Sequence, residues 1–481
     1  MDQKKLTKGC AAVLLIYIVL AAAFYLICGE QLHFYTRETE MLSPTADLGE
    51  LTSGTVVEQQ IDVRGDSLTS LTLMAGTYGR QNTGRLILSF YDGEDRIGST
   101  EIRVEDLGNG TEFTVPVSVE LGNSPSLSLR VTAPDSEPGN AVTLYYGNAF
   151  QTSRGKVETQ LEETERVQLN GESLDGKLCF GARTRTKSVF GEYYWYLAAA
   201  GLVFLALGCR RLIRKNLKGE PTPVLNVIIA FQRYRFLIKQ LVSRDFKTKY
   251  KRSVLGVMWS FLNPLLTMLV QYVVFSTLFR SNIPNYALYL LIGIVCFSYF
   301  SEATSLTLTS IVGNAGLITK VYVPKYLYPL TRVMSSTVNF LLALIPLFAV
   351  LLLTRTPIRW SFLLLPVPIV CLFALCLGIG LLLASSMVFF QDTQFLWSVL
   401  CMLWMYVTPI FYPESILPRI LLPLFKCNPL YHILRFVRAI LMNGVSPEPK
   451  AYLLMILVSF LPLAAGIFVF KKTQDRFVLY I

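Results

Sequence analysis

The chain has 481 residues, of which 52% are hydrophobic and only 16% are charged. Soluble proteins usually carry about 25% charged residues, so this composition excludes an entirely soluble protein and predicts an integral membrane protein with room for one soluble domain. Residues 29–190 contain 24 acidic and 14 basic residues, whereas the rest of the chain contains 9 acidic and 30 basic residues. This basic excess is typical of a membrane protein that meets anionic lipid, and it does not require nucleic acid.

The first segment, residues 1–29, has three lysines before an apolar run and is predicted to enter the membrane. This pattern fits either a cleaved signal peptide or an uncleaved anchor. Small residues are poorly placed for cleavage, which favours the anchor. In either case, the next residues are expected outside the cytoplasm.

Residues 30–190 are predicted to form an extracytoplasmic β-sandwich, loosely similar to jelly-roll modules that bind carbohydrate. Short runs of alternating apolar and polar residues are separated by turn residues, as a sandwich requires. The clearest runs are 69–76, 85–91, 112–120, 126–133 and 141–147. Only Cys179 of the nine cysteines lies here, so we expect no disulfide framework. The domain is interpreted as a glycan-binding module, a docking surface or a spacer.

The rest of the chain alternates apolar and basic segments. Residues 191–208 are predicted to form a second span, and residues 209–253 a cytoplasmic linker with an amphipathic interface helix at 225–242. Six further spans are predicted within a core of residues 254–470, at about 254–279, 287–312, 327–353, 361–389, 394–412 and 451–470. Residues 413–450 are rich in proline and are predicted to be re-entrant. Residues 471–481 are expected to form a cytoplasmic tail.

A cluster of cations, which we call the basic foot, directly precedes the first core span. It comprises Arg244, Lys247, Lys249, Lys251 and Arg252. No charged residue follows until the end of the run 254–279, and a helix of that length crosses a ~30 Å hydrocarbon layer. The basic foot is interpreted either as a positive-inside topology signal or as a site for anionic headgroups or substrate phosphates.

One carboxylate, Glu302, lies inside a predicted span. A charged side chain there is costly and usually faces a partner or water. Glu302 is therefore predicted to line a channel or to be protonated. The alternative is a hydrogen-bonded packing role near the outer end of the span. The two histidines, His33 and His432, are too isolated in sequence for a metal cage, so no metal site is expected.

Residues about 225–481 resemble the membrane subunit of ABC-2 type exporters that carry O-antigen polysaccharides and teichoic acids. The matching phrases are RDFKTKYKRSVLGVMWSFLNPLL from residue 244, NAGLITKVYVPKYLYPL from 314, QDTQFLW from 391, TPIFYP from 408 and NPLYHILRFVRAIL from 428. Thr408 departs from the more usual Ser. The simplest family members lack the segment before residue 224.

The resemblance implies a homodimer driven by two copies of a separate ABC ATPase chain, which binds the ATP and magnesium. This chain has no GxxxxGK[ST] phosphate loop, so no cofactor of its own is expected. Residues 313–325 are similar to the loop that couples the permease to the ATPase; the alternative is an ordinary cytoplasmic turn. The residues implied in coupling are Asn314, Leu317, Lys320, Val321, Val323, Pro324 and Lys325.

The implied substrate is a lipid-linked glycan in the bacterial cytoplasmic membrane. The basic foot would bind its diphosphate, and aromatic rings would line the polymer path because sugar C–H faces stack on rings. The candidate channel aromatics are Trp259, Phe261, Tyr272, Phe297, Tyr299, Phe300, Trp404, Tyr406, Phe411 and Tyr412. Two alternatives remain: a membrane glycosyl- or acyltransferase acting on lipid-linked sugars, and an ABC-2 exporter of drugs or small lipids. No catalytic residue is predicted in this chain.

Overall fold

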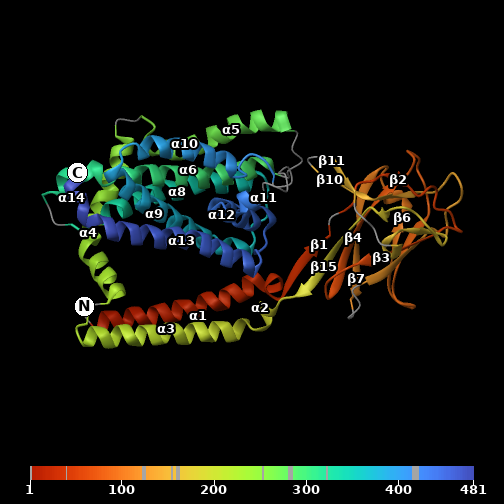
Figure 1. Ribbon diagram of the computed structural model, residues 1–481, viewed down its shortest axis with the longest axis horizontal. Helices are drawn as coiled ribbons and strands as arrows, with labels where there is room; N and C mark the ends of the chain where they lie inside the picture. The colour runs from red at the N-terminus through yellow and green to blue at the C-terminus, as the bar shows by residue number, and fades with distance from the viewer. Residues whose placement is uncertain are drawn as a thin grey trace. The chain divides into compact units, whose positions relative to one another are not determined.

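The computed structural model describes residues 3–480 except 40, 122–125, 153–154, 159–162, 221, 252–253, 280–284, 321–322 and 414–421. The chain divides into two compact units. One unit combines Met1–Gln31 with Tyr194–Ile481 and is helical; the other, Leu32–Tyr193, consists mainly of strands (Figure 1). Each unit is described by itself.

The β unit contains two large antiparallel sheets. The first has the order β1 (Phe34–Glu38), β15 (Phe180–Lys187), β4 (Ser67–Gly76), β9 (Thr143–Gly147) and β14 (Lys177–Leu178), with β7 (Thr111–Glu120) on β4 and β2 (Ala46–Asp47) on β9. The second has the order β13 (Glu172–Ser173), β12 (Gln168–Leu169), β3 (Val56–Asp62), β8 (Ser126–Thr132), β5 (Arg85–Asp92) and β6 (Asp95–Arg103). Strands β10 (Ala149–Thr152) and β11 (Gly155–Glu158) form a separate pair. Each of the five runs predicted from the sequence overlaps one of these strands.

Both large sheets contribute to one apolar core. Leu71 of β4, Leu88 and Phe90 of β5, and Leu129 of β8 are completely buried within it. Alternate residues of β3 and β7 are buried, because successive side chains of a strand point to opposite faces. Cys179 is a buried free thiol, and burial raises its pKa to about 12. The described part of the unit is therefore held by apolar packing.

A polar contact joins three loops of the β unit. The carboxylate of Glu50 accepts a hydrogen bond from the backbone N–H of Gly139 at 2.9 Å and pairs with Arg80 Nη1 at 2.7 Å. The hydrogen bond from Gly139, followed by that from Arg80, lowers the pKa of the Glu50 carboxyl. Both partners favour the charged carboxylate, so this contact weakens when Glu50 is protonated.

The helical unit begins with an antiparallel pair, α1 (Gln3–His33) and α3 (Tyr194–Leu217) (Figure 1). Tyr17 of α1 donates to the carbonyl of Ala198 at 3.0 Å, and Tyr194 of α3 donates to the carbonyl of Ala21 at 2.7 Å. Helix α4 (Pro223–Tyr250) follows, with Thr222 as its N-cap. The pair therefore leads directly into the helix that carries the basic foot.

The core helices are α5 (Trp259–Phe279), α6 (Tyr286–Leu308), α8 (Leu327–Leu353), α9 (Pro366–Phe389), α10 (Thr393–Val407) and α13 (Pro449–Thr473). Between α10 and α13 lie α11 (Leu422–Lys426) and α12 (Pro429–Arg438), with a π-helical turn at Ala439–Asn443. Among the described residues, seven helices are long and apolar enough to cross a membrane. Most of α6 is buried between its neighbours, so it forms the centre of the unit.

Three predicted boundaries differ from the structure. Helix α4 continues through the basic foot, because residues 243–250 contain no Gly or Pro and cations are favourable at a helix C-terminus. The first core helix begins only at Trp259, after a 3₁₀ turn. Helix α10 ends at Val407 rather than near residue 412, since Pro409 disfavours helical backbone at Thr408, which is extended. At 15 residues, α10 is only ~22 Å long, shorter than the hydrocarbon layer.

Candidate functional site

The basic foot lies on the last turns of α4. Arg244, Lys247 and Lys249 are exposed helical residues, and exposed Lys251 forms the C-cap of the helix. Arg252 lies outside the described residues. The helix thus presents several cations along one short segment beside the core.

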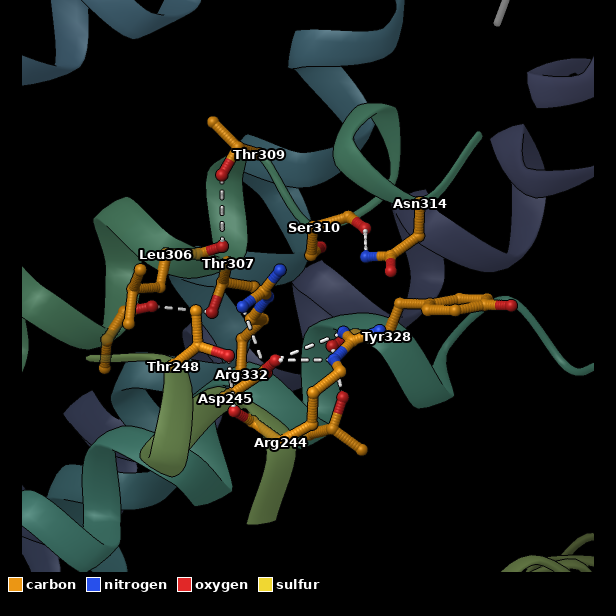
Figure 2. A network of polar contacts seen from close by, with 12 residues as sticks. Arg244, Asp245, Thr248, Leu306, Thr307, Thr309, Ser310, Asn314, Tyr328 and Arg332 are labelled. Carbon is orange, nitrogen blue, oxygen red and sulfur yellow. Dashed lines mark hydrogen bonds and ion pairs between the residues drawn. The ribbon is translucent and has the colours of Figure 1, made fainter. Parts of the chain in front are cut away.

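Asp245 connects the basic foot to the core (Figure 2). Its Oδ1 atom lies 3.1 Å from Arg244 Nη2, and its Oδ2 atom lies 3.0 Å from Arg332 Nη1 of α8. Only 9% of the Asp245 side chain is exposed. A single shielded carboxylate therefore neutralises part of the charge of two arginines and fixes α4 to α8.

A second bridge lies farther along α4. Lys249 Nζ and Asn339 Nδ2 of α8 each donate to Glu302 Oε1 of α6 at 2.8 Å. About 30% of the Glu302 side chain is exposed, so solvent still reaches the pair. Glu302 lies near the C-terminal end of α6, beside the basic foot. The hydrogen bond from Asn339 fits the alternative of a packing role, whereas the side of the membrane on which Glu302 lies stays a prediction.

Two adjacent cavities meet at this bridge and form what we call the polar groove. The larger has a volume of about 650 Å³ and includes Arg244, Asp245 and Arg332 in its lining. The smaller has a volume of about 270 Å³ and continues along α5, α6 and α8. Lys249, Glu302 and Asn339 line both cavities. The polar side chains that line the smaller cavity beyond them are Ser260, Asn263, Thr267, Ser298, Tyr299 and Ser336.

The ten candidate channel aromatics occupy different environments. Trp259, Tyr272 and Tyr406 are exposed, Phe261, Trp404 and Tyr412 are half-buried, and Phe297, Tyr299, Phe300 and Phe411 are buried. Trp259 and Tyr299 line the polar groove. Phe300 is enclosed between α6 and α10, with its ring 5.3 Å from that of Trp404. Phe411 stacks on Phe275 at 5.0 Å. The structure thus brings two of the ten rings to the groove.

The predicted coupling loop contains a short helix, α7 (Ala315–Ile318). Asn314 is buried and donates to the carbonyl of Ser310 at 2.8 Å, which anchors the start of the loop (Figure 2). Leu317 is 42% exposed, and Lys320 is exposed as well. Val321 lies outside the described residues. The helix therefore presents an exposed leucine next to a cation.

The end of the coupling loop is connected to the C-terminal segment. Lys325 Nζ donates to the carbonyl of Gln474 at 2.6 Å. Val323 and Pro324 are half-buried beside it. Lys325 therefore has a structural contact within this chain, which the sequence alone did not predict.

Hydrogen bonds connect two segments of the chain, residues 408–413 (TPIFYP) and residues 428–441 (NPLYHILRFVRAIL). Asn428 Oδ1 accepts from Trp404 Nε1 at 2.8 Å and from the backbone N–H of Leu430 at 3.0 Å, and Asn428 Nδ2 donates to Thr408 Oγ1 at 2.8 Å. Arg438 Nη1 donates to the carbonyl of Pro409 at 2.7 Å. These hydrogen bonds hold the segment that follows α10 against α12.

Sequence reasoning missed several polar residues of the groove, among them Asp245, Arg332 and Asn339. Arg332 lies inside the predicted span 327–353, so the argument applied to Glu302 applies equally to it. Asp245 lies among the cations of the basic foot, and a single carboxylate there gives no separate signal in the sequence. Asn339 is uncharged, and only the structure reveals its contact with Glu302.

The fold and the groove define a multi-pass membrane protein with a polar site among its helices. The family model of the ABC-2 type transporter matches residues 236–442. The O-antigen export system permease protein RfbA of Myxococcus xanthus is 30% identical over 261 residues, which cover 53% of this chain and 98% of that protein. RfbA of Klebsiella pneumoniae is 31% identical over 245 residues, covering 50% and 93%.

A more distant relative is the polysialic acid transport protein KpsM of Escherichia coli. It is 22% identical over 256 residues, which cover 51% of this chain and 96% of that protein. The chain therefore belongs to the ABC-2 type transporter family, among its polysaccharide export permeases.

Proposed function

We propose that this chain is the membrane subunit of an ATP-driven exporter that moves a lipid-linked cell-surface polysaccharide, such as an O-antigen or a teichoic acid, across the cytoplasmic membrane. The observation that carries this proposal is the polar groove along α5, α6 and α8. So many hydroxyl, amide and charged groups are not expected on a surface that faces lipid, because placing each of them in hydrocarbon costs free energy. A sugar chain, in contrast, needs such partners throughout its passage.

The groove has both kinds of contact that a sugar chain requires. Asn263 and Ser298 offer hydrogen-bonding groups, while Trp259 and Tyr299 offer aromatic faces. One set of six core helices is too small to enclose a channel wide enough for a polymer. We therefore propose a homodimer in which the grooves of two copies face each other.

The basic foot supplies the electrostatics for the lipid-linked end of the substrate. Lys247 and Lys251 are exposed, and Arg244 and Lys249 are held by carboxylates that a diphosphate can replace. Three cations and two carboxylates line the larger cavity, so its balance is positive. A diphosphate would be attracted to this end of the groove by charge-assisted hydrogen bonds.

The ATPase is proposed to be a separate chain that binds ATP and magnesium. Leu317 on the exposed face of α7 would insert into that partner, with Lys320 beside it. Asn314 would keep the loop rigid, so that closure of the ATPase moves α6 and α8 as a body. The contact of Lys325 with Gln474 would extend this movement to the C-terminal segment.

The β unit is proposed to be extracytoplasmic. Three lysines precede the apolar part of α1, and the last turns of α3 carry several further cations. Cations collect on the cytoplasmic side of membrane helices, so the segment between these two basic ends lies outside. The unit would then bind the emerging glycan, dock a cell-wall enzyme or act as a spacer.

The proposal is tested by blocking the groove. Ser298 is exposed and lines the smaller cavity, so Ser298→Trp should fill much of its volume. Cells that depend on this variant should lose the surface glycan, while the variant still assembles in the membrane. Ala465→Trp places the same side chain on an exposed position of α13 and should leave export intact. Normal export by Ser298→Trp would contradict the proposed path.

A further inference from the structure

A third cavity lies at the end of α6 that is opposite the basic foot. It has a volume of about 740 Å³ and includes Tyr289, in the first turn of α6, in its lining. Glu302, beside the basic foot, is 13 residues farther along the same helix, which corresponds to ~20 Å. The two charged regions thus lie at opposite ends of one membrane-crossing helix.

The lining of this cavity is predominantly cationic. Its titratable side chains, apart from tyrosines, are Lys426, His432, Arg435, Arg438, Glu448 and Lys450. Four of them are permanent cations at neutral pH, and only one is a carboxylate. Their positive potential adds within a concave wall, where the protein partly excludes water. The cavity therefore favours an anion.

Arg438 provides a fixed element of that charge. Its guanidinium donates to the carbonyls of Pro409, Ile410 and Tyr289, and it lies 3.4 Å from the centroid of the Tyr289 ring. The Nε atom is buried and has no hydrogen-bond partner among the described residues. No carboxylate contacts this guanidinium in the described part of the chain, so its charge is not neutralised by an ion pair.

We propose that this cavity binds the phosphate headgroup of the exported lipid-linked glycan at the outer face of the membrane. The proposal rests on the proposed function and adds a second site to it. Arg435 and Lys450 are exposed cations of the lining and would contact the phosphate oxygens. Pro409, Phe436 and Leu454 in the same lining give an apolar surface for the first part of the lipid chain.

The position of the site gives it a role in release. A headgroup that leaves the basic foot needs a favourable position at the other side, since an unpaired diphosphate is costly in a bilayer. The outer cavity would supply that position while the polymer clears the groove. An ordinary anionic phospholipid offers the same phosphate chemistry, so the experiment must separate the two sources.

The probe is farnesyl diphosphate, and the sample is the purified full chain in complex with its ATPase. Native mass spectrometry counts the probe molecules that are bound to each chain. Wild type should bind two probe molecules per chain. Arg435→Gln combined with Lys450→Gln should lose one of them, with an affinity loss of roughly tenfold or more, because charge-assisted hydrogen bonds are lost. Lys247→Gln combined with Lys251→Gln should lose the other. Lys471→Gln with Arg476→Gln, at exposed positions outside the cavity, should retain both.

Each result has a defined meaning. If the outer pair of substitutions retains both probe molecules, the inference is wrong, while loss at the basic foot still supports the proposed function. If the foot variant retains both probe molecules while the outer variant loses one, the proposed role of the basic foot fails and the outer site stands. Displacement of the outer probe by inorganic diphosphate supports phosphate recognition. Equal binding of farnesol contradicts that recognition, and equal displacement by phosphatidylglycerol overturns the assignment to the exported substrate.

Discussion

Asn428 gives the most quantitative prediction, because its side chain joins three partners at a buried position. Asn428→Ala removes the acceptor for Trp404 Nε1 and for the N–H of Leu430, and the donor to Thr408. Loss of an N-cap costs about 1 kcal/mol. Each interhelical side-chain hydrogen bond in a membrane protein contributes about 0.6 kcal/mol. The free energy of unfolding should therefore fall by about 2 kcal/mol.

The assay is equilibrium unfolding of the full chain in mixed micelles. Asn443→Ala, an exposed asparagine shortly after α12, serves as the control and should change the free energy by less than about 0.5 kcal/mol. Trp404→Phe keeps an aromatic ring but removes the donor. Combined with Asn428→Ala, it should give a coupling energy of about 0.6 kcal/mol. A loss no larger than the control, or zero coupling, would refute the reasoning.

Three further predictions concern charge and coupling. Lys249→Glu or Glu302→Lys alone should reduce surface glycan roughly tenfold, because each places like charges together. Combining the two substitutions restores opposite charges and should restore much of the glycan. If the combined variant stays as low as the single ones, the Lys249–Glu302 ion pair does not explain the loss. Leu317→Asp should abolish co-purification of the ATPase, whereas Leu217→Asp, on the exposed end of α3, should not; retained ATPase in Leu317→Asp would exclude α7 as the coupling element. The pKa of the Glu50 carboxyl is lowered in the folded state. The contribution of this carboxylate to the stability of the fold is therefore present at neutral pH and is lost as the pH falls through the lowered pKa. Thermal unfolding of the β unit should therefore become less acid-sensitive in Glu50→Gln, and an unchanged pH profile would contradict this.

Local patterns were sufficient to predict most of the elements. The alternation at 112–120 predicts β7 within one residue, and the apolar run 327–353 coincides with α8. Both signals lie in consecutive residues, which is where periodicity is read. The pairing of β1 with β15, in contrast, joins residues about 150 apart in sequence. No local pattern specifies that contact.

The candidate site was predictable in its charges but not in its pairings. The cations of the basic foot are evident as a cluster, yet Asp245 shares its carboxylate between Arg244 and Arg332 on another helix. Phe300 illustrates the same limit, because an aromatic residue in a span can face a groove or pack between helices, and this one is completely buried. The burial of a side chain depends on which helices pack against its own helix, and the sequence of that helix alone does not specify them.

The central claim, that the chain works as the membrane subunit of an ATP-driven exporter, is tested most directly by its partners. The tagged full chain would be purified from its native membrane in mild detergent, and the retained proteins would be identified and quantified. We expect a protein with a GxxxxGK[ST] phosphate loop to be retained in equal amount to this chain. If no such protein is retained, under conditions that keep an established ABC exporter intact, the chain is not the membrane subunit of an ATP-driven exporter.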